Sequence, residues 1–159
     1  MLFSTHLAGG AAAGAALALV IPDAPALGLV AAAAVAALGP DIDHAGSLAT
    51  KILGPAGRVT AALTTHRGVT HSPVAAAALG LLLLVLGAPT PYVMATVAGY
   101  LSHLVLDSLN PQGVPWLWPL LRRKITLPLV RTGGTIENLG VRPGCYLLTA
   151  TLIFTNFYN

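Results

Sequence analysis

His103 and Asp107 form the pair of residues in this sequence whose spacing most directly predicts metal chemistry. They lie four residues apart in a stretch that favours a helix, so an imidazole and a carboxylate share one face and can reach the same cation. Asp41 and Asp43 flank a single residue after another apolar stretch. That arrangement can direct two carboxylates at one ion or bridge two ions, so these four side chains are the first candidates for a metal site.

The five histidines fall in the same kind of short polar motif beside an apolar segment. A lone imidazole is more often structural, because a backbone carbonyl can satisfy it, but five histidines with three carboxylates favour a metal site. The candidate ligands are His6, Asp41, Asp43, His44, His66, His71, His103 and Asp107. Among them His44 is the weakest candidate, and its alternative role is to orient a ligating carboxylate.

The donor types indicate which ion and which chemistry to expect. Nitrogen and oxygen donors without thiolate favour Zn²⁺, with Mn²⁺ and Fe²⁺ as alternatives. Eight candidate ligands exceed what one tetrahedral ion binds, so we expect two or three ions. Such a site polarises a phosphoryl or acyl oxygen and lowers the pKa of bound water toward ~7, which predicts hydrolysis.

The composition predicts an integral membrane protein with a single domain, residues 1–159. The chain of 159 residues is 55% hydrophobic and only 8% charged, whereas about a quarter of the residues of a soluble protein are charged. A net charge of +3 from so few groups argues against a nucleic-acid partner, because phosphate contacts need many Lys and Arg. The single Cys145 excludes an internal disulfide.

Five apolar segments predict an all-α, polytopic transmembrane bundle of about five spans. Several are shorter than the ~20 residues of a full span, so their helices must extend into the flanking residues. Proline-rich turns join the first segment to the second and the third to the fourth, which predicts two antiparallel hairpins. The segments are Leu7–Ile21, Ala24–Leu38, Val74–Ala88, Tyr92–Leu109 and Cys145–Phe157. We expect the first to be a retained span, because no Lys or Arg precedes it as in a signal peptide.

Threading these spans in order places 39–73 and 110–144 on the side of the N-terminus. All eight basic residues then fall on that side, which the positive-inside rule identifies as cytoplasmic. They are Lys51, Arg58, Arg67, Arg122, Arg123, Lys124, Arg131 and Arg142. The sequence thus predicts a multi-pass inner (plasma) membrane protein whose metal site faces the cytoplasm through its loops.

Several residues on that face are candidates for contact with substrate. Arg67 lies between two candidate ligands and could hold a phosphate oxygen, or meet lipid headgroups instead. Glu137, the only Glu, is a candidate general base or added ligand, with a solvated loop residue as the alternative. The run Arg122–Lys124, with Trp116 and Trp118 nearby, suits a belt at the headgroups more than a grip on substrate.

The motifs and their order resemble those of the YdjM family of inner-membrane proteins. That family is classified among the metal-dependent hydrolases. The resemblance runs from His6 to about Pro119 through Pro40–His44, His66–Ser72 and Gly99–Asp107. More distantly, the order of these residues is similar to zinc-dependent phospholipase C, and this implies that Asp107 bridges two metals. A later His-x-x-x-Glu pair of that enzyme has no counterpart here, so a three-zinc set would need Glu137 or the extra histidines.

We therefore expect a membrane-embedded, metal-dependent hydrolase that cleaves a phosphoester of a lipid or lipid-linked substrate at the cytoplasmic face. A site at the ends of spans opens where headgroups lie. One alternative is a metal transporter or metal-sensing protein, although the first three spans have almost no polar residues along a route across the membrane. Another is a structural or regulatory protein in which metal holds the loops together.

Overall fold

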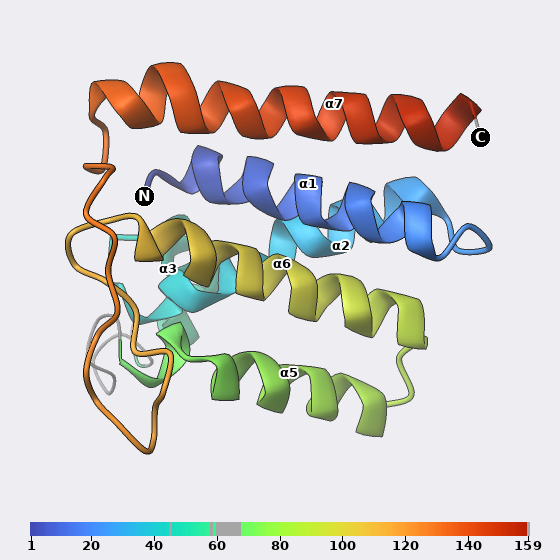
Figure 1. Ribbon diagram of the computed structural model, residues 1–159. Coiled ribbons are helices and arrows are strands. Elements are labelled where there is room, and N and C mark those ends of the chain that lie inside the picture. The colour runs from blue at the N-terminus through green and yellow to red at the C-terminus, as the bar shows by residue number, and fades with distance from the viewer. Residues whose placement is uncertain (45, 58, 60–67, 159) are drawn as a thin grey trace.

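The computed structural model describes all residues of the chain except 45, 58, 60–67 and 159 (Figure 1). Among the described residues the regular structure is helical, with one isolated bridge between Val114 and Ile125 and no strand. The predicted all-α class is confirmed. Each of the five apolar segments forms one helix of the bundle, and the bounds of these helices lie within a few residues of those predicted.

The bundle consists of five long helices in the described chain, joined by turns, a long loop and short helical elements. The long helices are α1 (Phe3–Val20), α2 (Ala26–Ala36), α5 (Pro73–Val85), α6 (Thr90–Ser108) and α7 (Arg142–Tyr158). The short elements are the 3₁₀ helices η1 (Gly39–Asp43) and η2 (Val69–His71), helix α3 (Leu48–Leu53) and the π-helix η3 (Glu137–Val141).

Helix α1 lies in the middle of the bundle and packs against α2, α6 and α7, while α5 packs on the outer side of α6 (Figure 1). Helices α2 and α6 run in the same direction, opposite to α1. The N-terminus, η1, the end of α6 and the start of α7 consequently meet at one end of the bundle (Figure 1). The motifs that carry the histidines and aspartates are brought to this end.

Glycines allow the three inner helices to approach one another at backbone distance. A Cβ added at Gly14 of α1 would lie 2.6 Å from the Leu29 carbonyl oxygen of α2. One added at Gly10 would lie 2.6 Å from the Ala33 carbonyl oxygen, and one at Gly99 of α6 would overlap the backbone of Ala33. Since a larger side chain would separate the helices, these glycines fix how close α1, α2 and α6 come.

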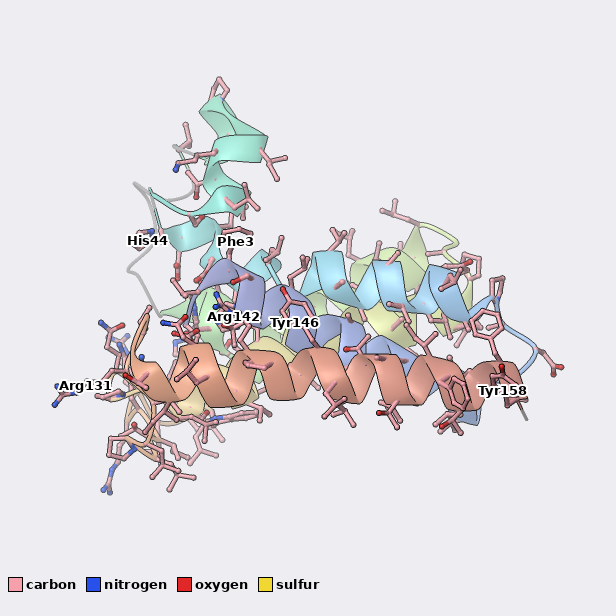
Figure 2. All side chains as sticks on the ribbon, turned by 90° about the horizontal axis from the view of Figure 1, so that it is seen from above. Phe3, His44, Arg131, Arg142, Tyr146 and Tyr158 are labelled. Atoms are coloured by element: carbon pink, nitrogen blue, oxygen red, sulfur yellow. The ribbon has the colours of Figure 1, made fainter. Side chains whose placement is uncertain are left out.

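Two helical stretches, Phe3–Val20 and Ala26–Asp43, are long and apolar enough to cross a bilayer. Helix α2 itself has 11 residues and α5 has 13, which at about 1.5 Å per residue is roughly 16 and 20 Å, short of the hydrocarbon core. The count of about five spans stays a prediction. The outer helices do expose apolar side chains, and among the described residues of α7 none is buried (Figure 2).

Candidate metal centre

Helix α6 supplies His103 and Asp107, both of them buried, and its contact with α2 fixes the imidazole. One turn beyond the close approach of Gly99 to Ala33, His103 Nδ1 lies 2.7 Å from the Ala37 carbonyl oxygen. A carbonyl can only accept, so Nδ1 carries the proton and donates it. The other nitrogen, Nε2, therefore keeps its lone pair and is a metal-binding atom.

A chain of polar contacts orients His71 in the same way. Its Nδ1 lies 3.1 Å from Asp43 Oδ2, and the hydroxyl of Thr70 donates a short hydrogen bond to the same carboxylate oxygen. The Tyr100 hydroxyl in turn donates to the Thr70 carbonyl. Because a carboxylate accepts the Nδ1 proton, the Nε2 lone pair of His71 points into the site, as in carboxylate–histidine–metal arrangements.

The two lone pairs face each other, since His71 Nε2 lies 3.3 Å from His103 Nε2. Two acceptor nitrogens at that distance repel unless a proton or a cation lies between them. Carboxylate oxygens flank the pair on both sides. Asp41 Oδ1 lies 3.6 Å from His71 Nε2 and 3.7 Å from His103 Nε2, and Asp107 Oδ2 lies 3.8 and 3.6 Å from the same two atoms.

These separations are slightly longer than those between ligand atoms around a small divalent ion. Bonds of about 2.0–2.1 Å to Zn²⁺ place tetrahedral ligand atoms roughly 3.3–3.4 Å apart. The nitrogen–nitrogen and nitrogen–oxygen separations here lie between 3.3 and 3.8 Å. His71, His103 and Asp107 thus form one group of three donor atoms that could hold a small divalent ion, and Asp41 Oδ1 lies near the same two nitrogens.

The second oxygen of Asp107 faces a different set of nitrogens. Oδ1 lies 3.3 Å from His6 Nε2 and 2.6 Å from the Met1 amino group. This ammonium stands where a metal ion beside the carboxylate could stand. The His6 ring stacks on His103 with centroids 3.6 Å apart. Neither ring nitrogen of this buried histidine has a hydrogen-bond partner among the described residues. His6 with Asp41 and His103 forms a further group of atoms that could hold an ion.

The electrostatics of this group, which we call the donor cluster (His6, Asp41, His71, His103 and Asp107), favour a bound cation. Carboxylates outnumber permanent cations in a region where burial makes uncompensated charge costly. Burial opposes protonation of His71, yet the neighbouring carboxylates of Asp41 and Asp43 outweigh it and raise the pKa of His71 above its ordinary value. Positive charge is thus stabilised where the two Nε2 atoms meet.

A cavity of about 430 Å³ opens beside the donor cluster. Asp41, which is 21% exposed at its side chain, is the member of the cluster that lines it. The remaining wall combines polar and apolar residues, namely Met1, Leu2, Phe3, His44, Gly46, Ser47, Leu48, Gln112 and Thr132. A substrate can therefore approach the donors from the loop side of the bundle.

The other predicted site residues lie elsewhere. Asp43 contacts the far nitrogen of His71, so it orients a donor in this geometry. His44 is exposed at the edge of the bundle, where its Nδ1 accepts from the Gly46 amide, and neither donor group includes it (Figure 2). His66 and Arg67 lie outside the described residues.

Glu137 is fully buried, which excludes the alternative of a solvated loop residue. Its carboxylate accepts hydrogen bonds from the amides of Leu2, at 2.7 Å, and Gly133, at 2.6 Å. Burial opposes its charge, but these backbone hydrogen bonds outweigh burial and lower the pKa of Glu137. The residue ties the chain before α1 to the loop before α7.

Sequence reasoning missed the groups that hold the donors in place. Thr70 and Tyr100 lie inside the recognised motifs His66–Ser72 and Gly99–Asp107, and that position was their available signal, although no role was predicted for them. The sequence offered no signal for the Ala37 carbonyl or the Met1 amine, because every residue carries the same backbone groups.

Comparison with known proteins agrees with the motifs. A protein-family model described as "YdjM inner membrane protein" matches residues 1–158. Inner membrane protein YdjM of Escherichia coli (strain K12) is 36% identical over 118 residues, covering 69% of this chain and 59% of that protein, and the protein of the same name from Shigella flexneri matches equally. YvsG of Bacillus subtilis (strain 168) is 29% identical over 165 residues, covering 100% of this chain and 98% of its own. No solved structure matches.

Proposed function

The chain belongs to the YdjM family of inner membrane proteins, and from that premise we propose that it is a metal-dependent hydrolase of the membrane surface. The observation that carries the proposal is the pair of facing Nε2 atoms of His71 and His103, 3.3 Å apart and flanked by two carboxylates. Zn²⁺ suits this donor set best, with Mn²⁺ and Fe²⁺ as alternatives. When bound, such an ion polarises a phosphoryl oxygen and lowers the pKa of a water molecule.

The protein's own residues have separate roles in this proposal. His71, His103, Asp41 and Asp107 hold the ion, and Asp107 has a second oxygen directed at His6, as a carboxylate that bridges two ions would. Asp43 and the Ala37 carbonyl fix the tautomers of the two histidines. The exposed edge of Asp41 meets the cavity, so the substrate is bound there and water is available to it.

A phosphoester of a lipid or lipid-linked compound is the proposed substrate. The cavity lies at the end of the helices, and its wall combines apolar side chains such as Leu2, Phe3 and Leu48 with polar ones such as Gln112 and Thr132. A headgroup joined to an acyl or polyprenyl chain presents the same two kinds of surface. The location supports a substrate that reaches the site from the membrane.

Transport is the second candidate, and the interior of the bundle argues against it. A transporter needs polar groups along a route to the far side. Beyond the donor cluster, the described core between α1, α2 and α6 includes the apolar cluster of Ala18, Leu29, Ala33 and Ala95. The cavity beside Asp41 likewise favours catalysis over a metal that only holds loops together.

Purified protein tests the proposal in two steps. Elemental analysis should find Zn²⁺ or another divalent ion, and the loaded protein in nanodiscs should release phosphate or headgroup from phospholipids or polyprenyl phosphates. Soluble nucleotides serve as a control for the water-facing side. Metal-loaded protein that hydrolyses none of these while carrying its ion across a sealed vesicle would establish the transport alternative.

The orientation of the site is part of the proposal, and basic side chains at its end of the bundle support a cytoplasmic position. In a Cys145→Ser background, cysteines placed at Ser47 and Thr90 should be labelled from opposite sides of the membrane. Labelling of both from one side would contradict the five-span arrangement, which is separate from the chemistry of the donor cluster.

A further inference from the structure

The chain between α6 and η3 is an ordered loop that is fastened to the end of α6. Val114 and Ile125 exchange backbone hydrogen bonds of 3.0 and 2.9 Å. The Leu127 amide donates to the Ser108 carbonyl at 2.7 Å, and Trp116 Nε1 donates to the Ser108 hydroxyl at 2.7 Å. These bonds fix the backbone of the loop, so the directions of its side chains are set by the fold.

This ordered loop directs its large apolar side chains outward. Leu120 is 87% exposed, and Leu117, Leu121, Ile125, Leu127 and Leu129 are between 46% and 64% exposed. In water the exposed parts of these side chains lose the stabilisation that burial would give them. A contiguous exposed apolar patch marks a surface that meets another apolar phase.

Three cations interrupt the patch. Arg122, Arg123 and Lys124 are all exposed and lie between Leu121 and Ile125. The sequence from 110 to 136 contains no Asp or Glu, and among the described residues none of the three cations has an ion pair. A run of unpaired cations with exposed apolar side chains on both sides is the pattern of a segment that enters an anionic membrane surface.

The loop also adjoins the candidate site. Gln112 lies near the start of this loop and Thr132 near its end, and both line the cavity beside Asp41. Asn110 joins the two ends, because its side-chain amide donates to the Thr132 hydroxyl at 2.8 Å. The two ends of the loop therefore lie at that cavity.

We propose that the loop Leu117–Leu129 is a binding site for anionic phospholipid. Its leucines enter the acyl region, while Arg122, Arg123 and Lys124 contact the phosphates of the headgroups. This surface is separate from the donor cluster and binds lipid whether or not the cluster hydrolyses it. A lipid so held presents its headgroup at the cavity.

The two tryptophans of the protein, Trp116 and Trp118, both lie at this loop, so intrinsic fluorescence reports on it alone. We would place the protein in phosphatidylcholine nanodiscs and titrate in brominated phosphatidylglycerol or, in parallel, brominated phosphatidylcholine. Phosphatidylglycerol should quench the tryptophans at a lower lipid fraction. The preference should weaken at high salt, because screening reduces the attraction between surface charges.

The double variant Arg122→Gln/Lys124→Gln should lose the preference, by about fivefold in apparent affinity for each cation removed. The matched control Lys51→Gln/Arg131→Gln removes the same charges from exposed positions at the same end and should keep it. Unchanged thermal unfolding verifies that both variants fold.

Equal quenching of wild-type protein by the two lipids would overturn the proposal, as would equal loss of preference in both double variants. Absence of quenching by either lipid would also overturn it, and would indicate that another protein surface, such as a second copy of the chain, covers the leucines.

Discussion

At the end of the bundle that carries the donor cluster, α1, α2 and α6 meet through polar groups, whereas at the opposite end the same helices meet through small apolar side chains. His6, His103 and Asp107 are buried at the first end, and Ala18, Leu29 and Ala95 at the second. Metal binding at the polar end depends on which donor atoms are present and how they are oriented. Stability at the apolar end depends on side-chain volume alone. Substitutions at one end should therefore change metal affinity, and those at the other should change stability.

The largest expected effect is on metal binding at the polar end. His103→Ala removes a nitrogen common to both possible donor groups, so metal affinity should fall by more than ~100-fold, beyond the loss typical of supporting residues. Elemental analysis after dialysis measures the loss. His44→Ala, at an exposed histidine outside the donor groups, is the matched control and should retain metal. Stoichiometric metal in the His103 variant would contradict the site.

At the apolar end the largest effect should come from added volume. Gly14→Leu places side-chain atoms against the Leu29 carbonyl and should destabilise the bundle by about 3 kcal/mol, which thermal unfolding in detergent detects. Gly144→Leu is the control, because no atom lies within 4 Å of a Cβ at that position of α7. Equal destabilisation by the two substitutions would show that packing at Gly14 is not what joins α1 to α2.

An intermediate effect is expected where the polar end depends on orientation. Asp43→Asn weakens the charged hydrogen bond that holds the His71 ring, so metal affinity should fall about 10–100-fold while the fold persists. Titration with Zn²⁺ measures the change. Asp23→Asn, in the turn between α1 and α2 at the opposite end, should leave affinity unchanged. A loss as complete as that of His103→Ala would instead make Asp43 a ligand.

The smallest effect concerns the tie made by Glu137. Glu137→Gln loses charge from two backbone hydrogen bonds and should lower stability by about 1–2 kcal/mol at neutral pH. Because folding lowers the pKa of this carboxyl, its contribution is present above the unfolded value of 4.5 and is lost as the pH falls below it. The gap in unfolding temperature between wild type and variant should therefore narrow in acid, and a constant gap would exclude the charge as its cause.

The sequence predicted the features of this arrangement that follow from the types of side chain and from their spacing along the chain. Five apolar segments gave five helices, and the four-residue spacing of His103 and Asp107 correctly placed both on one side of α6. The convergence of His6, Asp41 and His71 on that pair followed from threading the segments in order.

Other features could not be predicted because they depend on backbone atoms and on exact placement. Asp41 and Asp43 are equivalent in the sequence, yet the tight turn of η1 directs one toward the His71 Nε2 and the other toward its Nδ1. The burial of Glu137 depends on the amides of Leu2 and Gly133, which are far apart along the chain. Helix α2 ends at Ala36, earlier than its apolar pattern, because Gly39 and Pro40 begin a 3₁₀ turn.

The parallel contact of α2 with α6 also limits how the molecule can move. The two helices contact each other at two points, one helical turn apart: Gly99 packs against Ala33, and His103 hydrogen-bonds to Ala37. These two contacts fix the position of α6 along α2. Sliding α6 by one residue, about 1.5 Å, would turn its side chains by about 100° and carry His103 away from the Ala37 carbonyl. The position of His103 Nε2 is therefore fixed by the contact between these two helices. A change in the shape of the cavity beside Asp41 would have to come from the loops that line it.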